Sequence, residues 1–497
     1  MTVFATAPIR TPSIDWMAIA PEIALGFAAI AIVLLRSLMR RRRPVNEASL
    51  YLAIAGIAAA AALLVRQWVL VQDDGPITTI AGMVRVDGFG VFLGIVVVAA
   101  TALGVFLATA YLRREELEAP EYYALMLLSA AGMLTMTTAN NLVVVFLALE
   151  ILSIPLYVLA AFDRRRLSSQ EAGIKYFVLG AFSSAVFLYG VALVYGATGT
   201  TSLTGISQFL AHNTLFDDGT LLAGFALLLV GLGFKVAAVP FHMWTPDVYQ
   251  GAPTPVTAFM SSATKAAGFA ALLRVFGVAF PLYRSDWRPA VYALAAITMM
   301  VGTVATVIQT DVKRLLAYSS IAHAGYILIG FQVDTARGRE AALVYLLTYA
   351  FMTVGAFAVL TIATRRGDDH HAIDDYRGLA LRRPLLGGLL AFFLLAQAGM
   401  PLTGGFIVKL EVFAAAVAAD EWPLALIGVL TAVVAAYAYL RVAVGLFTAP
   451  EAEAALPSRS VDGWSAVVLA ATAAVVLAVG VAPGSFLQFA KDATFLL

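Results

Sequence analysis

Four charged residues lie inside long apolar runs of this sequence, where charged side chains are rare. Glu150 lies in VVVFLALEILSIPLYVLAAF, Lys235 in GFKVAAVPFHMW, Lys265 in AFMSSATKAAGFAALL and Lys409 in GGFIVKLEVF. A charge at the centre of a membrane-spanning helix costs roughly 2.5–3.5 kcal/mol, so such residues face the interior of a bundle and are usually functional. A lysine removed from water loses part of its preference for the charged form and can exchange a proton near neutral pH. We therefore predict that these four residues carry protons.

Two further ionisable residues can assist them. His323, in LLAYSSIAHAGYILIG, lies well inside a predicted helix, and the unperturbed imidazole pKa near 6.5 suits a relay between lysines. Lys175, in IKYFVLGAFSSA, begins a helix and is expected to reach the interface or to pair with Glu150. Glu411, two residues beyond Lys409, is treated as a secondary partner of that lysine. The plainer alternatives are a structural ion pair for Glu150, snorkelling for the lysines and a hydrogen-bonded core position for His323.

The composition places these residues in a membrane protein. Of the 497 residues, 61% are hydrophobic and 13% are charged, whereas a soluble domain carries about a quarter charged residues. The chain has no cysteine, which excludes disulfides, thiolate-bound iron–sulfur clusters and cysteine-based zinc sites. Its five histidines are too scattered for a metal or haem site, and a net charge of +1 gives no reason to expect nucleic acid as a partner. His370 and His371, in RRGDDHHAIDDYRG, are interpreted as part of a solvated cytoplasmic surface that contacts a neighbouring protein.

Fourteen apolar segments are long enough to cross a bilayer as helices, since a span needs roughly 20 residues. They lie near 16–36, 49–71, 88–111, 121–139, 141–162, 172–195, 220–242, 256–280, 289–309, 313–332, 340–363, 385–418, 424–447 and 464–487. The segment 385–418 is too long for one straight span and contains Gly399, Pro401, Gly404 and Gly405, so we expect a broken helix. The first fifteen residues lack the order of a cleavable signal, so the first segment is interpreted as an uncleaved anchor. The predicted fold class is an all-α integral membrane protein.

The distribution of basic residues predicts the orientation of these helices. Nineteen of the 32 lysines and arginines lie in connections after odd-numbered helices, and eight lie on the opposite side, termini included. Because cytoplasmic loops carry the excess of basic residues, the odd-numbered connections are expected in the cytoplasm. Both termini are then expected on the outer side of the membrane.

The spacing of the interrupted helices predicts an internal repeat. Helix seven, with Lys235 and Pro240, and helix twelve, with Lys409, lie five helices apart. A unit of five helices is odd in number, so helices 4–8 and 9–13 would form two inverted repeats, as in ion transporters. Each lysine is counted nine residues from the end of its segment, about 13 Å, which places both near the midplane. The predicted domains are 1–120, with three helices, the repeats 121–282 and 283–447, and the last helix in 448–497.

Five stretches of the chain resemble a known family. They are LALEILSIPLYVLAAF (147–162), IKYFVLGAFSSA (174–185), GFKVAAVPFHMWTPDVYQGAPTPVTAF (233–259), TDVKRLLAYSSIAHAGYILIG (310–330) and GMPLTGGFIVKLEVF (399–413). These stretches are similar to the antiporter-like membrane subunits of proton-translocating NADH:quinone oxidoreductase, respiratory complex I. The fourth is shared with Mrp-type cation/proton antiporters, whereas WTPDVYQGAPTP resembles the N-type subunit in particular. The M-type subunit has a glutamate in helix twelve where this chain has Lys409.

The resemblance implies roles for individual residues and for the whole chain. The family's glutamate in helix five matches Glu150, and its lysines in helices seven, eight and twelve match Lys235, Lys265 and Lys409. The chain would be a proton-translocating subunit in the bacterial inner membrane, surrounded by lipid and by other membrane subunits of complex I. NADH, FMN, iron–sulfur clusters and quinone would belong to partner subunits, and this chain would hold no redox centre or other cofactor.

Two alternative functions come from different classes. An Mrp-type cation/proton antiporter subunit would show sodium-dependent transport that needs neither NADH nor quinone. A purely structural membrane subunit would leave the intramembrane glutamate and lysines without a purpose. Co-purification with subunits that carry flavin and iron–sulfur clusters would indicate the complex I subunit.

Overall fold

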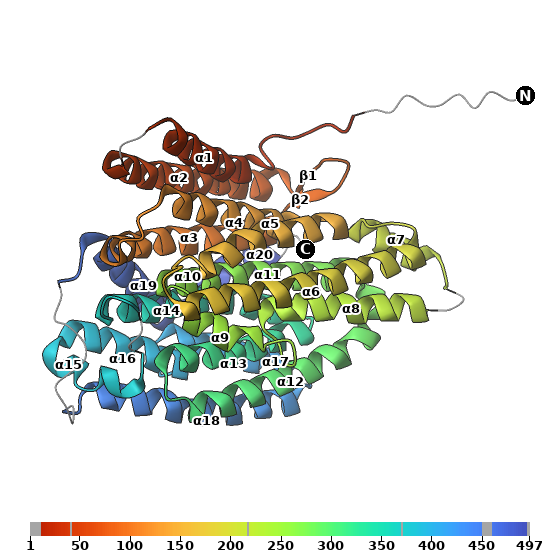
Figure 1. Cartoon of the computed structure of the whole chain (residues 1–497). Coiled ribbons are helices and arrows are strands. Elements are labelled where there is room, and N and C mark those ends of the chain that lie inside the picture. The colour runs from red at the N-terminus through yellow and green to blue at the C-terminus, as the bar shows by residue number, and fades with distance from the viewer. Residues whose placement is uncertain (1–10, 40–41, 216–217, 369–370, 450–459, 495–497) are drawn as a thin grey trace, which may run out of the picture.

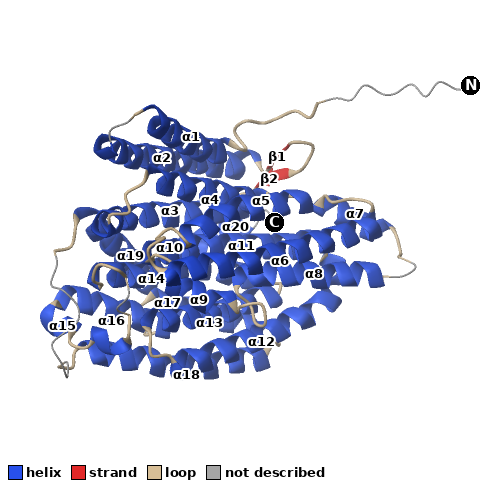
Figure 2. Cartoon of the chain, viewed as in Figure 1, coloured by secondary structure: helices blue, strands red, loops and turns tan. Residues whose placement is uncertain are grey.

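The structure is a computed structural model that describes residues 11–39, 42–215, 218–368, 371–449 and 460–494. Helices that run back and forth through one bundle make up almost all of it (Figure 1). Within the described ranges, the two strands β1 (Ile77–Thr79) and β2 (Val84–Val86) form one short antiparallel hairpin at the edge of the bundle (Figure 2). The expected all-α class is therefore confirmed.

The N-terminal part packs two long helices along one edge of the bundle (Figure 1). It consists of α1 (Ala20–Leu38), α2 (Arg42–Asp74), the hairpin and α3 (Gly88–Glu115). The side chain of Asp87 caps α3 by accepting a hydrogen bond from the Gly90 amide, which satisfies one of the free donors at a helix start.

The next part contains the first interrupted helix. Its elements are α4 (Pro120–Thr138), α5 (Leu142–Ala160), α6 (Leu167–Thr198), α7 (Leu203–His212), α8 (Gly219–Val236), α9 (Trp244–Gly251), α10 (Thr254–Phe259), η1 (Met260–Thr264), α11 (Lys265–Arg274), η2 (Val275–Ala279) and η3 (Pro281–Tyr283). The elements from α10 to η2 run on as one helix, Thr254–Ala279, in which η1 and η2 are wide π-helical turns. Such turns are rare and occur mostly at functional sites.

The C-terminal part contains the second interrupted helix. Its elements are α12 (Arg284–Ile308), α13 (Val312–Gln332), α14 (Ala336–Ala363), η4 (Ile373–Tyr376), α15 (Leu379–Arg382), α16 (Pro384–Ala398), α17 (Gly404–Ala418), α18 (Trp422–Leu446), α19 (Gly463–Val481) and α20 (Pro483–Thr494). Gly399, at the end of α16, has a φ of 92°, a left-handed conformation that glycine adopts without steric cost. The predicted break in segment 385–418 is confirmed.

The structure also corrects several predicted boundaries. Each of the fourteen predicted segments overlaps a helix, and eleven helices of the described chain are long and apolar enough to cross a membrane, so the number fourteen stays a prediction. The predicted interruption of helix seven is confirmed, but it follows Val236, directly after Lys235, so segment 220–242 is not helical to its end. The last span ends at Val481 rather than near 487, and α20 follows it. The short helix α7 and the hairpin were not predicted.

The break in helix seven changes the predicted equivalence of the two lysines. Lys235 lies just before its break, whereas Lys409 lies six residues into α17 and therefore after its break. The count of nine residues to a helix end was correct for Lys409 and wrong for Lys235. The inverted repeats and the four domain boundaries stay predictions, although both interrupted helices exist.

The connections after odd-numbered predicted helices meet at one end of the bundle. Asp368, in the connection after α14, contacts Tyr111 at the end of predicted helix three, Arg166 after predicted helix five and Thr254 in the connection after predicted helix seven. Asp368 and His371 are buried, so the interpretation of His371 as part of a solvated surface was wrong, whereas Arg365, Arg366 and Asp374 of the same connection are exposed. His370 lies outside the described residues.

Candidate functional site

Lys235 is buried at the C-terminal end of α8 and is held by two hydroxyl groups. Its Nζ donates to Ser153 Oγ at 2.8 Å and to Tyr176 Oη at 3.2 Å, and it lies 5.5 Å from the centre of the Tyr176 ring. The Tyr176 ring stacks on Trp244, the first residue of α9, at 4.6 Å between centroids. Both sides of the break in helix seven therefore position this ammonium group.

The predicted pairing of Lys235 with Glu150 is not a direct contact. Ser153 lies one turn beyond Glu150 on α5 and occupies the position next to the ammonium group. Glu150 Oε1 is buried and has no hydrogen-bond partner within the described chain. An unpaired carboxylate oxygen beside a buried ammonium can approach or withdraw, so the interaction between the two groups can change with geometry.

Lys175 does not pair with Glu150, contrary to one expectation. Its Nζ lies 2.6 Å from both Glu171 Oε1 and Asp247 Oδ2, and its side chain is 40% exposed. Arg314 on α13 also binds Asp247, at 2.6 Å. Lys175 thus helps to tie α6, α9 and α13 together through Asp247.

Lys265 is buried in the most enclosed helix of the described bundle. An 18-residue window of Thr254–Ala279 is 100% buried, and Lys265 itself is 3% exposed, so snorkelling to an interface is excluded. Its Nζ donates to the carbonyl oxygen of Ser320 at 2.5 Å and to Ser320 Oγ at 2.6 Å. The ring of Tyr349 lies 5.1 Å away.

Lys409 is buried at the break in helix twelve. Its Nζ donates to the carbonyl oxygens of Gln397 and Ala398, at 2.9 and 3.0 Å. These carbonyls belong to the last residues of α16 and have no partner within that helix, so the ammonium satisfies them and complements the helix dipole. Glu411, its predicted secondary partner, instead lies 3.3 Å from Arg337.

One face of α13 connects Lys265 with Lys409. Ser320, His323 and Tyr326 follow one another at intervals of three residues, so they lie on one side of the helix. Ser320 binds Lys265, and the Tyr326 ring lies 5.1 Å from Lys409 Nζ. His323 lies between them with Nδ1 at 2.8 Å from Tyr345 Oη, while its Nε2 has no partner within the described chain.

Lys235 packs against the helix that carries Lys265. A Cβ atom added at Gly268, one turn beyond Lys265, would lie 3.4 Å from Lys235 Cγ and 3.1 Å from Val236 Cγ1. The small residue lets the two helices approach closely at this depth. The structure therefore joins Lys235 to the Lys265 helix by packing and joins Lys265 to Lys409 through α13.

Some residues of the site were not predicted. Ser153, Tyr176, Ser320 and Gln397 hold the lysines, and Asp87 pairs with Arg274. Of these residues, only Ser153 could have been found from the sequence, because it lies one helical turn from Glu150. Within the described ranges, no group of three or more His, Cys, Asp or Glu side chains could hold a metal ion.

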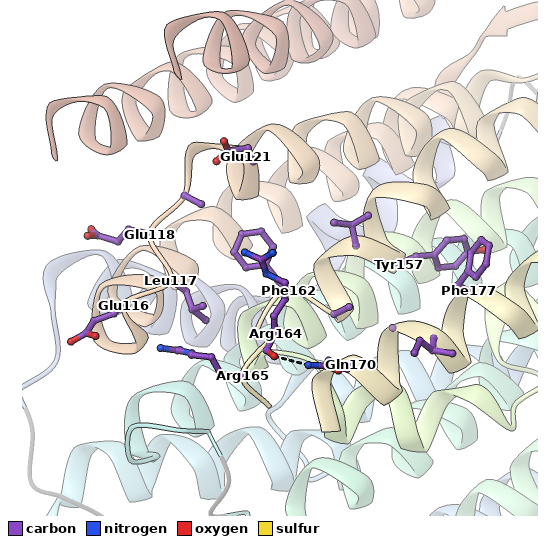
Figure 3. A pocket seen from close by; sticks show the side chains of 15 residues that line it. Glu116, Leu117, Glu118, Glu121, Tyr157, Phe162, Arg164, Arg165, Gln170 and Phe177 are labelled. Atoms are coloured by element: carbon purple, nitrogen blue, oxygen red, sulfur yellow. Dashed lines mark hydrogen bonds between the residues drawn. The ribbon is translucent and has the colours of Figure 1, made fainter. Parts of the chain in front are cut away.

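A large surface groove lies next to the Lys235 site, because Tyr157 lines it and packs against Tyr176 with 4.8 Å between ring centres (Figure 3). Its volume is about 1140 Å³, and its lining includes Glu116, Tyr157, Arg164, Arg165 and Phe177. Figure 3 shows the Gln170 side chain bound to the Arg164 carbonyl at one end of this groove. None of the six predicted site residues lines the groove, so the lysines form a packed chain of ionisable groups and not a substrate pocket.

The sequence is similar to one described protein family and to relatives that share one name. Residues 139–435 match the family described as "NADH:quinone oxidoreductase/Mrp antiporter, TM". A protein of Trichlorobacter lovleyi named "NADH-quinone oxidoreductase subunit N" is 42% identical over 485 residues, which cover 98% of each chain. A Mycobacterium bovis protein with the same name is 50% identical over 384 residues, 76% of this chain and 72% of the relative.

Solved structures share the fold. A chain of respiratory complex I from Thermus thermophilus, with bound aureothin, has a TM-score of 0.80 and 36% identity, covering 95% of this chain and 99% of that one. A chain of the Mrp complex from Dietzia sp. DQ12-45-1b has a TM-score of 0.85 at 21% identity, over 97% of both chains, which shows similarity of fold alone.

Proposed function

The chain belongs to the family of antiporter-like membrane subunits shared by NADH:quinone oxidoreductases and Mrp antiporters, and we propose that it moves protons from the cytoplasm to the outside as part of complex I. In this proposal it lies in the bacterial inner membrane with both termini outside. NADH, FMN, iron–sulfur clusters and quinone act in partner subunits, and this chain carries no redox centre.

One observation carries the proposal. Lys235, Lys265 and Lys409 are all buried, and each of their hydrogen-bond partners within the described chain is a hydroxyl or a carbonyl oxygen. A buried ammonium held by neutral acceptors can release its proton without leaving an uncompensated carboxylate behind. A structural lysine, in contrast, is expected in an ion pair, as Lys175 is.

The proposed route has three steps. Lys235 takes a proton from cytoplasmic water while Glu150 lies close enough to stabilise the ammonium. A neighbouring subunit then changes the separation of Glu150 from Lys235, which alters their interaction by several kcal/mol at low dielectric. The released proton passes to Lys265, then by Ser320 and His323 along α13 to Lys409, which releases it outside.

The test measures proton transport by the assembled complex. Glu150→Ala and Lys235→Ala should reduce the NADH-driven acidification of inside-out vesicles to below about a tenth, the loss typical of a missing proton-transfer group. The matched control is Glu116→Ala, because this glutamate is 69% exposed and pairs with Arg366 at the surface. Assembled complexes that pump at the wild-type rate in both variants would refute the route. Sodium-dependent transport without NADH would instead favour the Mrp-type antiporter.

A further inference from the structure

Asp368 is a fully buried carboxylate at the end of the bundle where the odd-numbered connections meet. It lies in the connection after α14 with a φ of 50°, a left-handed conformation that is strained for a residue other than glycine. Such strain persists only where the surroundings over-determine the conformation. The residues around it, here called the Asp368 cluster, are Tyr111, Arg166, Thr254, Lys313 and His371.

The charges in the cluster keep Asp368 ionised. Burial alone would raise the pKa of its carboxyl, but Lys313 at 3.7 Å, His371 at 3.0 Å and Arg166 at 3.3 Å together hold that pKa well below its usual range. Charge-assisted hydrogen bonds of this kind are about twice as strong as neutral ones. The carboxylate is therefore a fixed anchor across the pH range in which the protein works.

This anchor holds the first residues of two helices. Asp368 accepts hydrogen bonds from the Thr254 amide at 3.0 Å and from Thr254 Oγ1 at 2.7 Å, so it caps the start of the helix Thr254–Ala279 from outside. Within its own segment that helix start has no side-chain cap. Lys313, the second residue of α13, faces the same carboxylate and also donates to the Ala252 carbonyl at 2.8 Å.

The two anchored helices are the ones that meet at Lys265. Lys265 lies eleven residues beyond Thr254, about 16 Å along a helix, and Ser320 lies seven residues beyond Lys313 on α13. Between Thr254 and Lys265 the chain passes through the π-helical turn η1, which ends at Thr264. Single π-helical turns inside α-helices are frequently found at functional sites.

We propose that Asp368 is a positioning residue for proton transfer, because it holds the start of the Lys265 helix against α13 and so keeps Lys265 in contact with Ser320. This inference rests on the proposed role of Lys265. Asp368 acts from the start of this helix, about 16 Å along it from Lys265. It lies on the connection after α14, whose exposed residues a neighbouring protein can reach. Movement of the connection after α14 would then shift Lys265 relative to its acceptor.

The first measurement counts protons pumped per electron by assembled complex I in inside-out vesicles. Asp368→Asn and Thr254→Ala should lower this ratio by at least about twofold, since each removes a charge-assisted hydrogen bond at the helix start. Thr254→Ser keeps the hydroxyl group and should pump normally. Asp374→Asn is the matched control, because Asp374 lies six residues from Asp368 with an 84% exposed side chain.

The second measurement reports the position of the helix rather than transport. The chain has no native cysteine, so Thr264→Cys introduces a single thiol beside Lys265. Thr264 is buried and its hydroxyl has no partner within the described chain, so cysteine replaces it at little cost. Asp368→Asn should make this thiol react roughly ten- to hundredfold faster with maleimide, as expected for loss of a hydrogen bond to a charged group.

The outcomes separate this proposal from the proposed function. If Lys265→Ala pumps normally, the function assigned to Lys265 fails, while the labelling rate still decides whether Asp368 positions its helix. Normal pumping by an assembled Asp368→Asn complex would overturn the positioning role. A lowered number of protons pumped per electron without faster maleimide labelling at position 264 would also overturn it. If the Asp368→Asn complex does not assemble, Thr254→Ala is tested in its place. Equal pumping ratios for Thr254→Ala and Thr254→Ser would then overturn the positioning role.

Discussion

Replacing Arg274 with methionine should loosen the C-terminal end of the Lys265 helix. Arg274 is the last residue of α11 and binds Asp87 through two hydrogen bonds of 2.6 and 2.8 Å. Both side chains are 1% exposed, and Asp87 also caps α3. Removal of one partner from a buried ion pair costs roughly 3–5 kcal/mol, because the other charge stays buried without compensation. Arg85 lies 3.7 Å from Asp87 and still screens it, so we expect the lower value, about 3 kcal/mol.

Hydrogen–deuterium exchange of the assembled complex measures this cost. A change of about 3 kcal/mol corresponds to roughly a hundredfold faster exchange in peptides that cover the start of α3 and the end of α11. The double variant Asp87→Asn/Arg274→Met removes both charges and keeps an oxygen that can cap α3, so its exchange should return to within about tenfold of the wild type.

A partly exposed ion pair provides the control. Arg288 and Glu421 lie 2.9 Å apart, each 25% exposed, so Arg288→Met should change local stability by less than about 1 kcal/mol. If Arg274→Met exchanges no faster than Arg288→Met, the pair does not hold the helix. If the double variant exchanges faster than Arg274→Met alone, an unpaired buried charge is not the cause.

Three further predictions concern the other anchors. Ser153→Ala removes a hydroxyl acceptor of Lys235 and should slow proton pumping about tenfold, whereas Ser153→Thr keeps the hydroxyl group and should pump normally. Equal pumping rates of the two variants in vesicles would contradict this prediction. Lys409→Met leaves two carbonyls at the end of α16 without a donor and should abolish pumping, and normal acidification would remove Lys409 from the route. Because the folded-state pKa of Asp368 lies below its unfolded value of about 3.9, its stabilisation is present above that value and is lost at lower pH. The difference in thermal midpoint between wild type and Asp368→Asn should therefore persist at about pH 5 and above and shrink as the pH falls below about 3.9, and its disappearance above about pH 5 would contradict the ion-pair assignment.

Properties that depend on local sequence were predictable. The low proportion of charged residues indicated a membrane protein, and Gly399, Pro401, Gly404 and Gly405 indicated the break in helix twelve. The cost of placing a charge in an apolar run singled out Glu150 and the three lysines before any contact was known. These signals are local, because apolarity and backbone freedom belong to each residue and its immediate neighbours.

Contacts between distant residues were decided only by the tertiary structure. Lys175 binds Asp247 instead of Glu150, Ser153 separates Lys235 from Glu150, and Asp368 is buried although its segment is rich in charged residues. In a membrane helix that is apolar on every side, periodicity does not show which face meets another helix. The sequence therefore determined which residues carry charge inside the membrane. Packing determined which group each charge meets, because partners such as Thr254 and Asp368 lie 114 residues apart and come together only when the bundle forms.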